Sequence, residues 1–147
     1  MQSISLPIIV FVAIGVSALS GCGAKGDPKP GQRHPPASCA VRATGLRTIE
    51  VVLPTADIQG NRLSGVEVVR VYYLSLGTNY PSALEVLQHG EIIMERHRHD
   101  LPSPGKMITF DLSNFGRSSG WLVVVPFRVG NIAGAPSQVL PWLDPSF

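Results

Sequence analysis

Residues 121–129, WLVVVPFRV, decide the fold of this chain. Nearly every side chain is apolar, and β-branched and aromatic types predominate, which is typical of a strand. At a period of two, one face of the strand carries Trp121, Val123, Val125, Phe127 and Val129, and the other carries Leu122, Val124, Pro126 and Arg128. Pro126 has no N–H to donate to a ladder, so it indicates a sheet edge, a bulge or an outward position.

Four segments upstream have the same character and predict further strands: residues 46–53 (LRTIEVVL), 66–74 (VEVVRVYYL), 91–99 (EIIMERHRH) and 107–112 (MITFDL). Gly, Pro, Asn and Asp separate these segments, as at turns. Only residues 81–90 (PSALEVLQHG) favour a helical turn. Short strands at this spacing, without a long helix, predict an all-β fold that is an antiparallel β-sandwich or a small barrel.

Residues 127–140 (FRVGNIAGAPSQVL) indicate which sandwich to expect. They resemble the F–G corner of fibronectin type III domains, where Asn-x-x-Gly-x-x-Ser follows an alternating strand. Asn131, Gly134 and Ser137 hold those positions, and Asn and Gly are the residues that accept the left-handed region in such a turn. Residues 63–73 are similar to strand C of the family, and residues 35–54 to strands A and B. The resemblance implies a fibronectin type III or immunoglobulin-like β-sandwich over residues 38–147.

This chain departs from the family pattern at three places. The tryptophan expected late in strand B is absent, with Leu53 near its place. The Leu-x-Pro-Gly-Thr-x-Tyr corner before strand F is replaced by residues 114–121 (NFGRSSGW), and residues 77–104 are longer than a typical C-to-E connection.

The N-terminal segment, residues 1–21, contains no Asp, Glu, Lys or Arg. Its apolar run is short for a membrane span, which needs about 20 residues, and small residues follow it. This pattern predicts a secretory signal peptide over residues 1–21, although its first residues contain no Lys or Arg. A transmembrane anchor is the alternative.

Residues 19–22, LSGC, resemble the lipobox of bacterial lipoproteins. The resemblance implies cleavage between Gly21 and Cys22, a diacylglyceryl group on the Cys22 thiol and an acyl group on the freed amine. It implies no other cofactor. The residue after the cysteine is Gly23 and not Asp, which by analogy with enteric bacteria favours attachment to the outer membrane, with the protein facing the periplasm. The alternative locations are the cell surface and the inner membrane. The alternative to lipidation is that Cys22 is a cysteine that follows a signal peptide by chance.

Residues 22–37 begin with the cysteine whose acylation the resemblance implies. The segment is rich in Gly, Pro and Lys and offers little to bury, so its composition predicts a disordered tether. Basic side chains there suit anionic headgroups. The start CGAKGDP is also similar to that of small Gram-negative lipoproteins, including one that assists maturation of the lipopolysaccharide translocon. That similarity implies an alternative role, as an accessory factor of an outer-membrane assembly machine acting through its acylated tail.

Three groups of side chains are candidates for chemistry. His97 and His99 stand two apart in residues 95–100 (ERHRHD) and predict neighbouring positions on one strand face, as two metal ligands have. A zinc enzyme needs a third ligand and an open position. Candidates for the third ligand are His89, Glu95 and Asp100. The same charged residues would also be expected on a solvent-exposed edge strand, where they prevent pairing with another sheet. We therefore expect no metal centre.

The tyrosines Tyr72, Tyr73 and Tyr80 suggest a sugar platform, but core packing is the expectation for the two in the strand. Cys39 has no intramolecular partner once Cys22 is acylated, so a small buried residue is expected, with an intermolecular disulfide or reactive thiol as the alternative.

Nothing else in the chain indicates catalysis. No nucleophile elbow, P-loop or dinucleotide-binding glycine pattern is present in the sequence. The net charge of +2 gives no argument for binding nucleic acid. We therefore expect a membrane-anchored, non-catalytic binding or assembly module of the cell envelope. Its expected partners are the lipid bilayer, through Cys22, and an envelope protein.

Overall fold

The structure is a computed structural model that describes residues 33–45, 47–77, 79–116 and 118–143. The chain divides into two units, residues 1–32 and residues 33–147, and everything described belongs to the second unit. The predicted signal peptide, Gly21 and Cys22 lie outside the described residues. Within the described part, no helix has the length and apolar character needed to cross a membrane.

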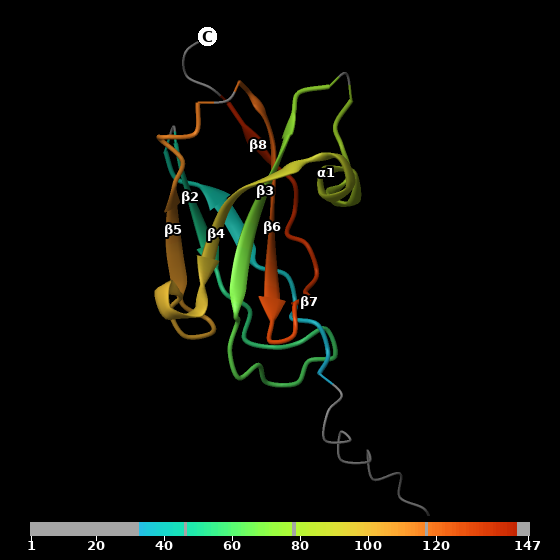
Figure 1. Cartoon of the computed structure of the whole chain (residues 1–147), viewed down its shortest axis with the longest axis vertical. Helices are drawn as coiled ribbons and strands as arrows, with labels where there is room; N and C mark the ends of the chain where they lie inside the picture. Colours follow the sequence, from blue (N-terminus) through green and yellow to red (C-terminus); the bar gives the residue numbers. More distant parts are fainter. Residues whose placement is uncertain (1–32, 46, 78, 117, 144–147) are drawn as a thin grey trace, which may run out of the picture. The chain divides into compact units, whose positions relative to one another are not determined.

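Two antiparallel sheets pack against each other (Figure 1). The three-stranded sheet has the order β1 (Ala40–Ala43), β2 (Thr48–Val52) and β5 (Met107–Asp111). The five-stranded sheet consists of β4 (Glu91–His97), β3 (Val68–Ser75), β6 (Gly120–Arg128), β7 (Ile132–Ala133) and β8 (Leu140–Trp142), with both β7 and β8 paired to β6. The prediction of an all-β antiparallel sandwich is confirmed.

Strand β6 buries side chains on both of its faces. Leu122 and Val124 belong to the main core, together with Val51 and Phe110 of the three-stranded sheet. Val123, Val125 and Phe127 belong to a second cluster that includes Val86, the buried residue of the helix α1 (Ala83–His89). The period-two alternation predicted for β6 therefore holds, and a helix covers part of the face turned away from the other sheet.

The helix α1 lies within residues 81–90, where a helical turn was expected. It begins after a capping box, in which Ser82 Oγ accepts from Glu85 N at 3.2 Å and Glu85 Oε2 accepts from Ser82 N at 2.6 Å. It ends before Gly90, where a Cβ would lie 2.3 Å from Val86 O and 2.6 Å from Tyr73 O. Glycine at that position allows the chain to pass closely against β3.

Pro126 lies opposite a break between β7 and β8. These two strands pair with the two ends of β6, and residues 134–139 run past its middle. Pro126 O accepts from Gly134 N at 2.7 Å, and Val124 O accepts from Ser137 N at 2.9 Å. Backbone groups alternate along a strand, so the proline nitrogen faces this break and not β3. A central strand thus accommodates proline where its outer ladder is interrupted.

The residues of the predicted F–G corner differ in part from the expected backbone conformations. Asn131 has a φ of +58°, as predicted, but its left-handed partner is Gly130, with a φ of +87°, and not Gly134. Gly134 is required for a different reason, because a Cβ there would lie 2.7 Å from Pro36 O and 2.9 Å from Pro126 O. Ser137 is buried, and its Oγ accepts from Val124 N and donates to Gln138 O, both at 2.9 Å.

The segment just before β1 is part of the sandwich. Ile58 N donates to Pro35 O, Ala37 N to Ala56 O and Ala135 N to Pro36 O, at 2.9 to 3.0 Å. Pro36 is buried and forms a bridge with Asp57. Composition alone assigned residues 35–37 to the tether, but backbone hydrogen bonds hold them to the fold, because the proline carbonyls still accept.

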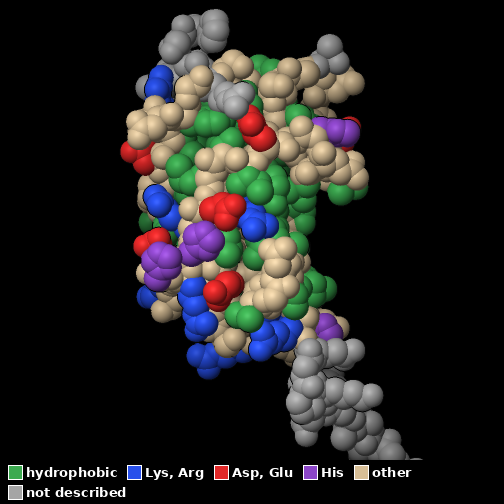
Figure 2. All heavy atoms as spheres, in the orientation of Figure 1, with side chains coloured by type: hydrophobic (Ala, Val, Ile, Leu, Met, Phe, Trp, Pro, Cys, Tyr) green, Lys and Arg blue, Asp and Glu red, His purple; other side chains and the backbone are tan. Residues whose placement is uncertain are grey.

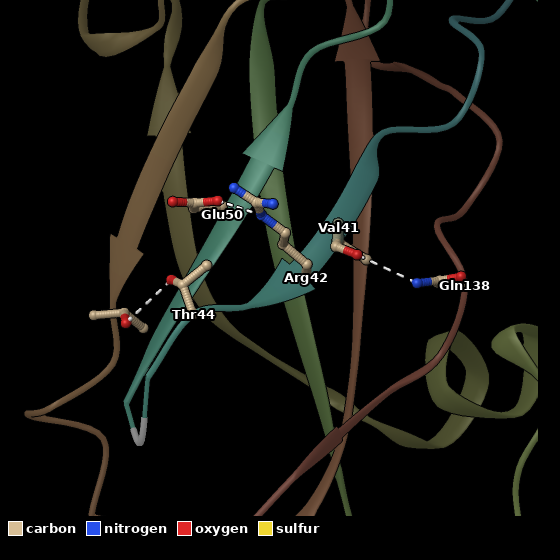
Figure 3. A network of polar contacts seen from close by, with 6 residues as sticks. Val41, Arg42, Thr44, Glu50 and Gln138 are labelled. Atoms are coloured by element: carbon tan, nitrogen blue, oxygen red, sulfur yellow. Dashed lines mark hydrogen bonds and ion pairs between the residues drawn. The ribbon is translucent and has the colours of Figure 1, made fainter.

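Gln138 covers the outer edge of the three-stranded sheet. Its Nε2 donates to Val41 O of β1 at 3.2 Å, while Arg42 pairs with Glu50 across β1 and β2 (Figure 3). A sheet edge covered in this way is protected from pairing with another strand.

Tyr73 organises the corner that departs from the fibronectin pattern. Its hydroxyl donates to Ser118 O at 2.7 Å, and its ring meets Phe115 edge-on at a centroid distance of 5.0 Å. Phe115 in turn contacts Trp142 of β8, and Leu53 is fully buried in the same core. A tyrosine from β3 therefore ties down the loop before β6.

Candidate functional site

The best candidate for a binding site is a hollow at the end of the five-stranded sheet where β3 ends and β6 begins. Its volume is about 330 Å³. The lining comes from the β3–α1 connection, from α1 and from β6, and includes Leu76, Asn79, Tyr80, Glu85, His89 and Trp121. We call it the aromatic hollow.

Two aromatic rings form one wall of the aromatic hollow. Tyr80 and Trp121 meet edge-on, with centroids 4.5 Å apart and planes at 61°. Tyr80 remains 65% exposed, although its hydroxyl donates to Val139 O at 3.0 Å. That hydrogen bond holds the tyrosine ring in place over the start of β6 while leaving its face to solvent.

Apolar side chains line the hollow beside the two rings. Leu76, just beyond β3, is 54% exposed, and Leu74 and Pro81 also belong to the lining. The indole Nε1 of Trp121 is buried and has no hydrogen-bond partner among the described residues. Apolar side chains grouped around a hollow favour a docked ligand or protein segment.

The acidic group of the aromatic hollow is committed to the helix cap. Hydrogen bonds from the Ser82 backbone and then from its hydroxyl lower the pKa of Glu85 below its ordinary value, since both favour the ionised carboxylate. Glu85 is thus a fixed negative charge at neutral pH. This arrangement suits binding of an apolar or aromatic group beside a carboxylate.

His97 and His99 do lie side by side. His97 ends β4, His99 lies in the short 3₁₀ helix Arg98–Asp100, and their rings stack at 6.3 Å and 7°. Each Nε2 faces a carboxylate nearby in the chain: Glu95, two residues before, at 3.6 Å for His97, and the adjacent Asp100 at 3.1 Å for His99. The described residues contain no group of three or more His, Cys, Asp or Glu arranged to hold a metal ion. For a metal site, the described residues therefore provide the histidine pair but no third ligand beside it.

The tyrosines do not form one platform. Tyr73 is buried in the main core and Tyr72 packs against the second cluster, as expected for core residues. Tyr80 alone is largely exposed, and its aromatic neighbour is Trp121. Sequence reasoning missed this pair, because residues 41 positions apart meet only through the order of the strands.

Cys39 is a core residue just before β1. It is 3% exposed, and burial raises the pKa of its thiol to about 12. A thiol that stays protonated at neutral pH is a poor nucleophile. Its surroundings therefore fit the expected packing role.

No protein family matches the chain, and no curated protein was found to be similar to it.

Proposed function

We propose that this chain is a lipid-anchored, non-catalytic binding or assembly module of the bacterial cell envelope. The aromatic hollow carries the binding part of the proposal, since Tyr80 and Leu76 both leave apolar surface exposed beside Trp121. An apolar segment of an envelope protein is the occupant that suits it. The LSGC pattern at residues 19–22 supports the anchor.

The anchor places the module at a membrane. Each methylene of an acyl chain that is buried in the bilayer contributes about 0.8 kcal/mol to the free energy of membrane binding, and stable attachment needs more than one acyl chain. A diacylglyceryl group and an N-acyl group on Cys22 meet that condition. Gly23 after the cysteine supports the outer membrane, facing the periplasm, as the location.

Intact mass tests the anchor. We expect the protein made in a Gram-negative host to have the mass of the chain from Cys22 plus acyl groups, and to partition into the membrane fraction. Cys22→Ala should lose both properties, while the matched control Cys39→Ala should keep them. A wild-type mass that still includes residues 1–21 would contradict the lipoprotein proposal.

Photo-crosslinking tests the aromatic hollow. A photoreactive residue in place of Leu76, beside the hollow, should give a discrete protein adduct in intact envelopes. The same residue in place of Met107, which is similarly exposed on β5, should not. Tyr80→Ala should abolish the adduct at position 76. Identical adducts at both positions would mean that the hollow has no specific partner.

The start CGAKGDP supports a second proposal, that the acylated tail itself acts on an outer-membrane assembly machine. A chain truncated after residue 37 distinguishes this proposal from the first one, because it keeps the acylated tail and lacks the sandwich. Full activity of that truncated chain in assembly of the machine would support the tail, and loss of activity with the tail still acylated would support the sandwich.

A further inference from the structure

We infer that one end of the sandwich binds the anionic phospholipid headgroups of the membrane that holds the anchor. We call this end the basal end. It comprises Arg33, where the described chain begins, the loop at residues 54–66, the 3₁₀ helix Arg98–Asp100, and Arg128 at the end of β6 with Val129 just beyond it. The inference rests on the membrane attachment proposed above, and it assigns a surface and an orientation to it.

Three arginines from separate segments surround one cavity at the basal end. Arg33, Arg98 and Arg128 line a space of about 230 Å³. Arg128 is held in place, because its Nη1 donates to His34 O at 3.0 Å, whereas Arg33 and Arg98 are exposed. Guanidinium groups bind phosphate through paired N–H donors, so this arrangement suits a phosphodiester headgroup.

Two further basic residues extend this surface. Arg62 lines a neighbouring cavity with Ser64, which the two cavities share, and with Ser103 and Pro104. Lys106 lies next to that segment, and its carbonyl accepts from Leu53 N just beyond β2. Figure 2 shows Lys and Arg side chains gathered at this end of the described chain.

The acidic residues at the basal end are each engaged. The oxygens of the buried Asp57 accept from the backbone of Gln59 and Asn61 and from the Asn61 side chain, at 2.9 to 3.2 Å. Asp100 pairs with His99 at 3.1 Å. Glu67 is 3.8 Å from Arg98 and lines the arginine cavity, so it offsets part of its charge.

The opposite end of the sandwich has the reverse charge balance. Glu85 in α1, Glu91 at the start of β4 and Asp111 at the end of β5 lie there, with Arg47 just before β2. The charge of the described domain is therefore polarised along its strands. An anionic surface favours approach by the basal end.

Apolar side chains accompany the arginines. Ile58 is 56% exposed, and its N–H is bonded to Pro35 next to the start of the described chain. Val129 is 44% exposed and lines the arginine cavity. Basic and apolar side chains side by side suit the interface of a bilayer, where one kind meets phosphate and the other the acyl boundary.

Chain length favours the same orientation. Ten residues lie between Cys22 and Arg33, so Arg33 cannot be more than about 40 Å from an acylated Cys22. A short connection therefore keeps the whole domain close to the membrane, and the charge of the basal end then decides which surface meets the headgroups. The aromatic hollow, at the other end of β3 and β6, then faces away from the membrane.

Photo-crosslinking of the full chain in membranes tests this orientation. A diazirine residue at position 58 or 129 should give phospholipid adducts, and one in place of Leu84 should give none. In vesicles of 70% phosphatidylcholine and 30% phosphatidylglycerol the basal adducts should persist. In pure phosphatidylcholine they should fall at least fivefold, since each basic residue near an anionic surface contributes about fivefold and several gather at this end. The mass of Cys22 reports the anchor separately, so a failed anchor and a failed orientation give different results.

Charge variants complete the test. Replacing Arg33, Arg62 and Arg98 together with Gln should lower the basal adducts at least fivefold. The matched variant with Arg42, Arg47 and Arg96 replaced by Gln has the same net charge and should leave them unchanged, provided both variants melt like the wild type. Equal lipid adducts at positions 58, 129 and 84, protein adducts in place of lipid at the basal sites, or equal losses in both variants would overturn the inference.

Discussion

Replacing Ser137 with alanine should destabilise the sandwich far more than its size suggests. Ser137 is 2% exposed, and its Oγ accepts from Val124 N, in the middle of β6 opposite the break between β7 and β8. Val124 is itself buried, so water cannot replace the lost acceptor. A buried donor without a partner costs about 1–3 kcal/mol. With an unfolding entropy of about 2.1 cal/mol/K per residue, a domain of about 115 residues loses about 4 °C in Tm per kcal/mol, so we expect a fall of roughly 4–12 °C.

Thermal and urea unfolding of Ser137→Ala measure this cost, and hydrogen exchange of the Val124 amide locates it. The control is Ser103→Ala, at an exposed position before β5, which should change the free energy of unfolding by less than about 0.5 kcal/mol. If Ser137→Ala matches that control and the Val124 amide stays protected, the assignment of Ser137 as the replacement for a strand partner is refuted.

Three further predictions concern the core. Gly134→Ala should lower Tm, because its Cβ would lie 2.7 Å from Pro36 O, whereas Gly65→Ala, with nothing within 4 Å, should not; equal melting of the two variants would contradict the close approach. Tyr73→Phe should cost about 0.5–1.5 kcal/mol in chemical denaturation by removing the bond to Ser118 O, and an unchanged midpoint would show that the bond is dispensable. Cys39 should resist alkylation in the native state at pH 8 and react in urea. Because burial raises the pKa of its thiol to about 12, its contribution to stability is present below about pH 9 and is lost as pH rises further; native alkylation at the rate of the unfolded chain would contradict this.

Local pattern determined much of the fold. Segments rich in β-branched and aromatic residues predicted β2, β3, β4, β5 and β6, with a period of two in β6. A Ser-x-x-Glu cap before an apolar run lay in the segment expected to hold a helical turn. These signals were readable because strand and cap preferences depend on neighbours a few residues away. The same is true of the LSGC pattern, which predicts an anchor from four adjacent residues.

Other features depended on segments distant in the sequence. Gly134 is required by the carbonyls of Pro36 and Pro126, and composition could not reveal this contact. Both faces of β6 are buried because α1 folds back over one of them, so alternation alone did not tell core from surface.

The candidate surfaces show the same division between sequence and structure. The sequence by itself determined an all-β chain with a predicted lipid anchor. Only the tertiary structure placed Tyr80 against Trp121, and Arg33 near Arg98 and Arg128. Strand composition follows from local sterics and hydrophobic periodicity, whereas these groupings arise from the strand order of two packed sheets, which brings together loops that carry no shared local pattern.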